Sequence, residues 1–322
     1  MTAPITLVVF AVLAATLGAR LLARSAWLDR SPRLGICAWQ ALSFSVITAV
    51  VLAGAALALP AVPFSADIAE LLSACAMALR DQYATPGGVA ISATGAVVAG
   101  TVLGRAGYCL TAGLVSASRA RRRQLDALTL VAHRHEGFDA LVVNHTTAAA
   151  YCLPGRRQQV ILTTGALDAL DDEQLAAVLA HERAHLRGRH DVVLAAAAAL
   201  LSAFPRVPAF RYAHRELTRL VEMLADDVAA RRNDRLTIAT ALVCLAQASA
   251  PAAALGAGGS TSLARVRRLV APAHPLGATR SAFAALATAA LLATPAAVVA
   301  APAVVAATAD LCPIGFPGQT LS

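Results

Sequence analysis

The sequence predicts a mainly α-helical integral membrane protein with about four transmembrane helices and one cytoplasmic α+β domain that contains a small sheet. Composition is the first observation behind this prediction. Of the 322 residues, 58% are hydrophobic and only 14% are charged, whereas a soluble globular domain carries about 25% charged residues. The second observation is a set of long apolar stretches, and the third is one polar stretch, "LDDEQLAAVLAHERAHLRG", in the middle of the chain.

Four apolar stretches are long enough to cross a bilayer, which takes about 20 apolar residues of helix. They are residues 4–23, 35–59, 89–115 and 281–309. The first has no basic segment before it and is long enough to span, so we do not expect it to be a cleavable signal peptide. A fifth apolar run, residues 192–204, is too short to span and favours a buried core helix or a re-entrant segment.

Arginine clusters beside these stretches predict their orientation. All 27 basic residues are arginine, and they gather in the loop at 24–33 and in "SRARRR" directly after the third stretch, whereas the loop between the second and third stretches is acidic. By the positive-inside rule both termini lie outside and the segment from 117 to 280 is cytoplasmic. The net charge of +8 is then explained by the membrane flanks, and we expect no direct nucleic acid binding.

The predicted organisation follows from these spans. It comprises a membrane region with three transmembrane helices, a cytoplasmic domain, a fourth transmembrane helix and a short extracytoplasmic tail, at residues 1–116, 117–280, 281–309 and 310–322. Six scattered cysteines form no CxxC pair, so they indicate neither a zinc ribbon nor a disulfide framework. Cys75 and Cys312 fall on the outer side, where a disulfide between them is a hypothesis. The segment at 250–262, "APAAALGAGGSTS", reads as a flexible linker.

The polar stretch carries helix signals at both ends. Asp171 or Asp172 can cap its start, and Asp171 with Gln174 three residues later resembles a capping box. An apolar stripe follows, and Gly188 is a plausible stop. We therefore expect a helix of about four turns.

Within this helix the motif "HERAH" indicates a metal site. His181 and His185 are four residues apart, which places both imidazoles on one face, where they can share a metal ion. Zinc suits two imidazoles and a carboxylate, because one tetrahedral position stays open for water. Glu182 can then serve as the general base that takes a proton from this water.

A third ligand is expected downstream, in "VEMLADDVAARR" on a second predicted helix at 211–231. Glu222 can complete the site, and Asp226 can orient a ligand histidine. Acidic residues beside "ARR" are by themselves more often part of a surface charge pattern. Because these two follow the HExxH helix, a role in the metal site is favoured instead. The domain is therefore expected to be a zincin-like protease domain.

HExxH followed by ExxAD resembles the gluzincin membrane peptidases, namely the CAAX prenyl proteases, the HtpX-like proteases and the BlaR-type antirepressor metallopeptidases. The resemblance covers residues 139–232, and three spans before the domain with one after it look most like the BlaR type. It implies that His181, His185 and Glu222 are zinc ligands, that Glu182 is the base and that Asp226 supports a ligand.

Two features depart from the resemblance. The related sequences often carry aspartate where this chain has His190, and Asp191 comes one place later. Only 13 residues, 310–322, follow the fourth span, so an extracellular penicillin-binding sensor is missing and direct β-lactam sensing is not expected.

The remaining motifs are predicted with alternatives. The β-branched run at 139–164 predicts two or three strands, and an edge strand near 148–153 could bind an extended substrate by main-chain hydrogen bonds. His214, eight residues before Glu222, is a possible oxyanion stabiliser or a solvated surface histidine. We expect His133 and His135 beside a helix end or turn, and Arg183 facing solvent or lipid headgroups.

These observations predict an integral-membrane zinc endopeptidase of the plasma membrane, with its active site on the cytoplasmic side. Its substrate would be a protein or peptide, such as a cytoplasmic transcriptional repressor, or the chain itself at 250–262. The alternatives are an HtpX-like quality-control protease and a non-catalytic zinc-binding receptor, against which Glu182 argues. A transporter would need ionisable residues within the spans, and these have almost none.

Overall fold

The computed structural model describes residues 2–59, 77, 85–135, 137–155, 158–249, 259–272 and 274–309. The chain forms two compact units. The first comprises Met1–Gly18, Ala41–Arg105 and Ala287–Ser322, and the second comprises Ala19–Gln40 and Ala106–Leu286. The predicted cysteine pair, Cys75 and Cys312, lies outside the described residues, as does most of the predicted linker.

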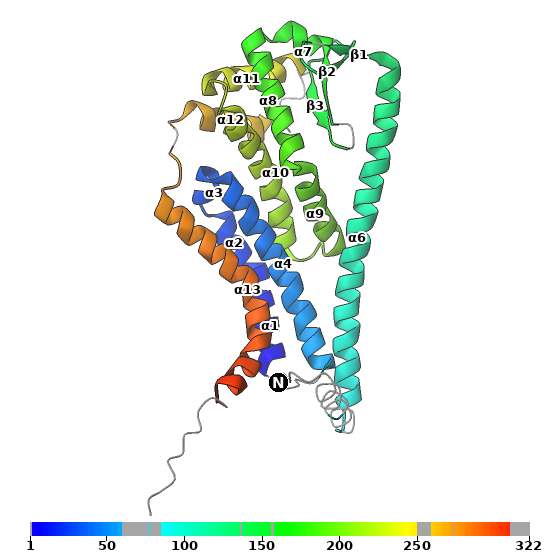
Figure 1. Ribbon diagram of the computed structural model, residues 1–322, viewed down its shortest axis with the longest axis vertical. Helices are drawn as coiled ribbons and strands as arrows, with labels where there is room; N and C mark the ends of the chain where they lie inside the picture. The colour runs from blue at the N-terminus through cyan, green and yellow to red at the C-terminus, as the bar shows by residue number, and fades with distance from the viewer. Residues whose placement is uncertain are drawn as a thin grey trace, which may run out of the picture. The chain divides into compact units, whose positions relative to one another are not determined.

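Within the residues that the structure describes, four helices are long and apolar enough to cross a membrane, in agreement with the four predicted spans. These stretches are Thr2–Ala23, Pro32–Ala58, Gly88–Leu128 and Ala278–Ala301. The first is built from α1 (Thr2–Leu13), a π-helical turn (Ala14–Gly18) and α2 (Ala19–Ala23), and a short α3 (Trp27–Arg30) follows. The others belong to α4 (Pro32–Ala58), α6 (Gly88–Val131) and α13 (Ala278–Ala309) (Figure 1).

Helix α6 extends well beyond the predicted end of the third span at 115. It runs for 44 residues, through the arginine cluster and up to the first strand. No glycine or proline follows Gly113 within it, so nothing in the arginine-rich segment stops the helix. The predicted boundary at 116/117 therefore falls inside a continuous helix.

Small residues bring the helices of the first unit close together. Gly54 of α4 faces Gly95 of α6, and a Cβ on Gly54 would lie 2.6 Å from the Gly95 carbonyl oxygen. The Ser45 hydroxyl donates a 2.8 Å hydrogen bond to the carbonyl of Leu291 on α13. Close approach through glycine and interhelical serine hydrogen bonds are typical of helices packed in a membrane.

The second unit contains a four-stranded mixed sheet in the order β1-β2-β4-β3, where two or three strands were expected. The strands are β1 (Ala132–His135), β2 (Ala140–Val143), β3 (Ala150–Leu153) and β4 (Gln159–Thr163). β2 and β4 are parallel, and the outer pairs are antiparallel. His133 and His135 lie between the end of α6 at Val131 and a turn at 137–139, as predicted, and pairing with β2 additionally makes them part of a strand. β3 is an edge strand, as predicted.

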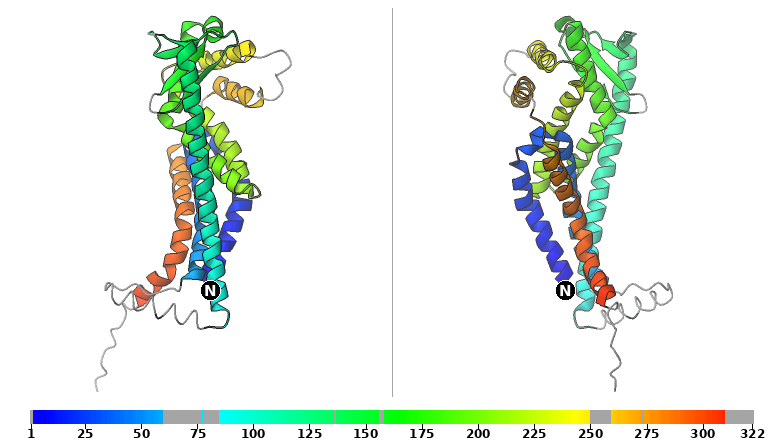
Figure 2. Two further views of the ribbon diagram at one scale, coloured as in Figure 1. Left: turned by 90° about the vertical axis from the view of Figure 1, so that its right-hand side faces the viewer. Right: turned by 60° about the vertical axis from the view of Figure 1, so that its left-hand side comes forward.

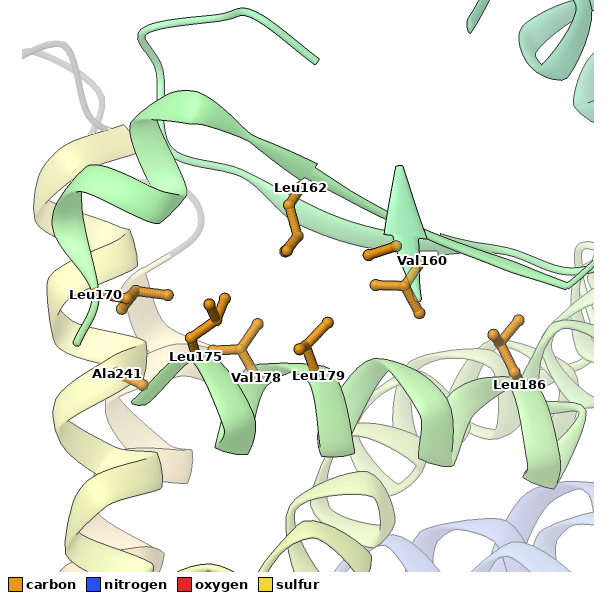
Figure 3. Close-up of a cluster of buried hydrophobic side chains, with 9 residues drawn as sticks. Val160, Leu162, Leu170, Leu175, Val178, Leu179, Leu186 and Ala241 are labelled. Atoms are coloured by element: carbon orange, nitrogen blue, oxygen red, sulfur yellow. The ribbon is translucent and has the colours of Figure 1, made fainter. Parts of the chain in front are cut away.

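One face of the sheet packs on the motif helix α8 (Asp172–Gly188), which follows the short α7 (Thr164–Ala169). Val160 and Leu162 of β4 point toward Leu175, Val178 and Leu179 of α8 (Figure 3). The capping box is confirmed, since the Asp171 carboxylate accepts from the Gln174 N–H and the Gln174 side chain accepts from the Asp171 N–H. The cap and this apolar contact together fix where α8 starts and which face it buries.

Four more helices complete the second unit: α9 (His190–Ala203), α10 (Pro208–Ala229), α11 (Arg235–Ser249) and α12 (Gly259–Val270). The short apolar run is thus a helix, and α10 begins before the predicted residue 211 because Pro208 suits a first helical turn. α12 was not predicted, and residues 259–262, assigned to the linker, form its first turn. α11 and α12 lie side by side, as both views in Figure 2 show.

Candidate active site

Helices α8 and α10 bring the three predicted metal ligands together. The Nε2 atoms of His181 and His185 are 3.1 Å apart. The two carboxylate oxygens of Glu222 each lie 3.5 Å from one of these nitrogens. One ligand atom from each residue falls within 4.8 Å of the others. The i, i+4 spacing on α8 therefore produces the shared face that the sequence predicts.

These separations fit a zinc ion. Bonds of about 2.0–2.1 Å in tetrahedral geometry place ligand atoms roughly 3.3 Å apart. The separations of 3.1–3.5 Å scatter around this value. Two imidazoles and one carboxylate are also the ligand set that leaves one tetrahedral position free for water or substrate. The donor set and its spacing therefore suit a catalytic zinc site.

Each of the two predicted ligand histidines has a partner on its outer nitrogen. The Asp226 carboxylate accepts from His181 Nδ1 at 2.9 Å and is only 1% exposed. His190 Nδ1 lies 3.0 Å from His185 Nδ1. If His185 Nε2 is to bind metal, its Nδ1 carries the hydrogen and donates to His190, whose own hydrogen is then on Nε2. Asp191 instead pairs with Arg121 of α6 at 3.3 Å.

The histidine pKa values follow from these partners. Burial lowers the pKa of His185 to about 4, so this imidazole is neutral at physiological pH. Burial also acts to lower the pKa of His181, but the hydrogen bonds that it donates to the Asp226 and Glu222 carboxylates outweigh burial and raise this pKa to about 9. In the metal-free chain His181 therefore holds a proton that a metal ion has to displace.

Glu182 lies, with His181, in the wall of a cavity. Burial raises the pKa of its carboxyl above the ordinary value, which moves the group toward the range of a general base. The Cys152 thiol of β3 hydrogen-bonds to this carboxyl, and burial together with the nearby Glu182 charge raises the pKa of Cys152 to about 12. Cys152 is therefore a neutral donor to Glu182 and a poor nucleophile.

The cavity has a volume of about 250 Å³ and is lined by both polar and apolar residues. Its polar residues are His181, Glu182, Glu222 and Arg265. The other wall residues are small or apolar and come from β3, α8 and α11, namely Ala150, Ala177, Val178, Ile238, Ala241, Leu242 and Leu245. An apolar side chain can therefore lie beside His181 without leaving polar groups unpaired.

Among the described residues, no strand pairs with the outer edge of β3, which lies next to this cavity. The Ala149 carbonyl accepts from the Thr163 N–H at 3.0 Å, so Ala149 directs its backbone groups toward β4. Because directions alternate along a strand, the N–H and C=O of Ala150 and Cys152 face away from β4, at the open edge. An extended peptide can form backbone hydrogen bonds with this edge of β3 and then lies beside the cavity.

Arg265 of α12 is a residue of the site that the sequence reasoning missed. Its Nε and Nη2 donate to both Asp226 carboxylate oxygens at 2.8 and 2.7 Å, and its Nη1 lies 2.9 Å from Glu222 Oε2. The available signal was "GSTSLARVRRLV", in which Ser or Thr can cap a helix with apolar Leu263, Val266 and Leu269 three residues apart.

Two predicted residues lie elsewhere. His214 is two turns before Glu222 on α10, about 12 Å along the helix axis, and it is absent from the cavity wall. The proposed oxyanion role of His214 therefore has no support from this geometry. Arg183 donates to the Phe138 carbonyl at 2.6 Å and ties α8 to the segment after β1. Arg183 is half-buried, so it is less exposed than a side chain directed into solvent or headgroups would be.

The comparisons with known proteins agree with this geometry. No curated protein and no solved structure matches the chain. The model of Peptidase family M48 matches residues 116–285, which is more than half of the 322 residues and includes every residue of the site just described. The match supports a metallopeptidase of the gluzincin type, and the chain belongs to Peptidase family M48.

Proposed function

We propose that the protein is a zinc-dependent endopeptidase of the membrane. The observation that carries the proposal is the convergence of His181, His185 and Glu222 at zinc-ligand separations, with Glu182 in the wall of the adjoining cavity. A purely structural metal site needs no free carboxylate beside an open cavity, so the presence of Glu182 favours catalysis over the non-catalytic receptor.

The metal ligands, Glu182 and β3 have separate roles in the proposed reaction. Zinc, when bound by these three ligands, supplies Lewis acidity that polarises a carbonyl and lowers the pKa of water to about 7. Glu182 accepts a proton from the attacking water and returns it to the leaving amine. The open edge of β3 holds the substrate backbone extended, so that the scissile bond lies beside Glu182.

The cavity indicates a class of substrate side chain. Seven of its eleven wall residues are alanine, valine, isoleucine or leucine. We therefore expect preferred cleavage beside an apolar residue, since burying such a side chain contributes about 1.5–3 kcal/mol.

The direct test compares the detergent-purified wild type with Glu182→Gln on casein and a peptide library. The general base contributes about 10²–10⁴-fold, so kcat should fall by at least about 100-fold while zinc stays bound. Glu173→Gln is the matched control, because Glu173 lies at the exposed start of the same helix. Equal activity in the wild type and Glu182→Gln, or a zinc-loaded wild type without activity, would contradict the proposal.

We further propose a regulatory role at the plasma membrane, with the site on the cytoplasmic side. The alternating arginine bias of the loops supports this orientation, and three candidate spans before the peptidase domain with one after it support the BlaR-type interpretation. The substrate would be a cytoplasmic repressor or the segment 250–262 of the chain itself. A substrate profile with one defined protein supports this role, whereas many unfolded substrates support quality control of membrane proteins.

A further inference from the structure

We propose that Arg265 is a positioning residue of this peptidase, and that α12 completes the active site by delivering it. The inference rests on the proposed function, because it assigns a role within the same site. It starts from the position of one guanidinium, which contacts both the third metal ligand and the partner of the first.

The contacts of Arg265 fix two carboxylates at once. Nε and Nη2 form a paired interaction with both oxygens of Asp226, at 2.8 and 2.7 Å. Asp226 Oδ1 is thereby shared between Arg265 and His181 Nδ1. The planar guanidinium thus sets the plane of the Asp226 carboxylate, which in turn orients the His181 ring with Nε2 toward His185.

The third nitrogen of the guanidinium acts on Glu222. Arg265 Nη1 is 2.9 Å from Glu222 Oε2, the oxygen that lies 3.5 Å from His181 Nε2, and Oε1 lies 3.5 Å from His185 Nε2. Arg265 therefore binds one carboxylate oxygen, while each of the two oxygens faces one of the histidines. This arrangement selects one rotamer of Glu222 before a metal ion arrives, and pre-organised ligands bind with a smaller loss of conformational freedom.

Arg265 also compensates negative charge in the site. The buried site contains three carboxylates, those of Glu182, Glu222 and Asp226. With neutral ligand histidines, a divalent ion alone would leave one negative charge uncompensated. Arg265, whose side chain is only 11% exposed, supplies the missing positive charge. An unpaired buried charge is costly, so its compensation stabilises the metal-loaded site.

Helix α12 is itself held firmly on α10 and α11. Arg268, one turn after Arg265, pairs with both oxygens of Asp227 at 2.7 and 2.9 Å. Arg235 at the start of α11 donates to the Leu269 and Arg268 carbonyls at 3.0 and 2.6 Å, which caps the end of α12. These contacts fix the position of α12, so that Arg265 reaches Asp226.

The test measures zinc affinity and steady-state kinetics in the full-length protein in detergent. Zinc affinity is obtained by competition with a chelator for wild type, Arg265→Gln, Arg265→Lys and the matched control Arg267→Gln, an exposed arginine on the same helix. Loss of a residue that orients metal ligands typically costs 10–100-fold in metal affinity or activity. We expect this loss for Arg265→Gln in zinc affinity, and in kcat at saturating zinc with KM changed less than about twofold.

The lysine variant separates positioning from folding. An ammonium group can neutralise one carboxylate but cannot pair with Asp226 and Glu222 together, so Arg265→Lys should fold, with zinc affinity between those of the wild type and Arg265→Gln. Wild-type zinc affinity in Arg265→Gln, or in Arg265→Lys if the glutamine variant fails to fold, would overturn the proposal, as would a change in KM alone. A wild type that binds zinc but cleaves nothing would refute the proposed function, and the affinity comparison would still decide the role of Arg265.

Discussion

Gly188→Ala probes the partner of His185 without changing any charge. Gly188 is the last residue of α8, and a Cβ placed there would lie 2.7 Å from Cδ2 of the His190 ring and closer still to its Nε2. Real Cβ contacts essentially never fall below 3.0 Å. The obstacle is a side chain and not backbone, so the His190 ring, which is only 4% exposed, has to move. The 3.0 Å contact between His190 and His185 is then lost.

The magnitude follows from the role of this contact. Loss of a hydrogen-bonding partner of a metal ligand costs 10–100-fold in metal affinity or activity, which corresponds to about 1.4–2.7 kcal/mol. Alanine in place of glycine favours the helix by up to about 1 kcal/mol, so the thermal stability of the metal-free protein should not fall. The predicted signature of Gly188→Ala is weaker zinc binding at unchanged or increased stability.

Chelator competition measures the zinc affinity, and thermal unfolding without zinc measures the stability of the metal-free protein. Arg189→Gly is the control, because Arg189 has a φ of 49°, a conformation that suits glycine, and its replacement creates no contact with His190. It should keep zinc affinity and not lower stability. Wild-type zinc affinity in Gly188→Ala would refute the reasoning about His190, and a parallel loss of stability would indicate a folding defect instead.

Three further predictions concern proton displacement from His181, substrate pairing at β3 and the core beneath the sheet. Because His181 holds a proton below its pKa of about 9 in the metal-free chain, apparent zinc affinity should fall by up to about tenfold per unit as pH decreases below 9; a pH-independent affinity would contradict this. Ala150→Pro removes an N–H from the open edge of β3 and not from the ladder with β4, so KM for peptides should rise at unchanged zinc affinity; unchanged cleavage would exclude substrate pairing there. Leu162→Ala, at a residue that is 0% exposed between the sheet and α8, should lower the free energy of unfolding by about 2–5 kcal/mol in denaturant titration, whereas a change below about 1 kcal/mol would contradict its core position.

The parts of the molecule that local sequence determines were predictable. α8 has its cap, its apolar stripe and its metal-ligand spacing within 19 consecutive residues, 170–188, and the structure places each where the pattern predicts. The four apolar helices follow in the same way from length and composition. Glu222 and Asp226 required only the additional assumption that a second helix packs on the first.

The parts that depend on tertiary contact were not predictable. β1 has the sequence "AHRH" and becomes a strand only because β2 pairs with it. Arg265 follows an alanine- and glycine-rich segment that suggested a linker, and its role is visible only once α12 lies beside Asp226. Likewise, His190 acquires its function from the turn between α8 and α9, which brings its Nδ1 to His185.

The zinc content of the purified chain tests most directly whether His181, His185 and Glu222 form a metal site. We predict one zinc ion per chain in the wild type and in Glu182→Gln. Zinc should be lost in a double variant, His181→Ala with His185→Ala, and in Glu222→Ala. Absence of zinc from the wild type after zinc loading, or its retention in the double histidine variant, would contradict the central claim that these three residues form a catalytic metal site.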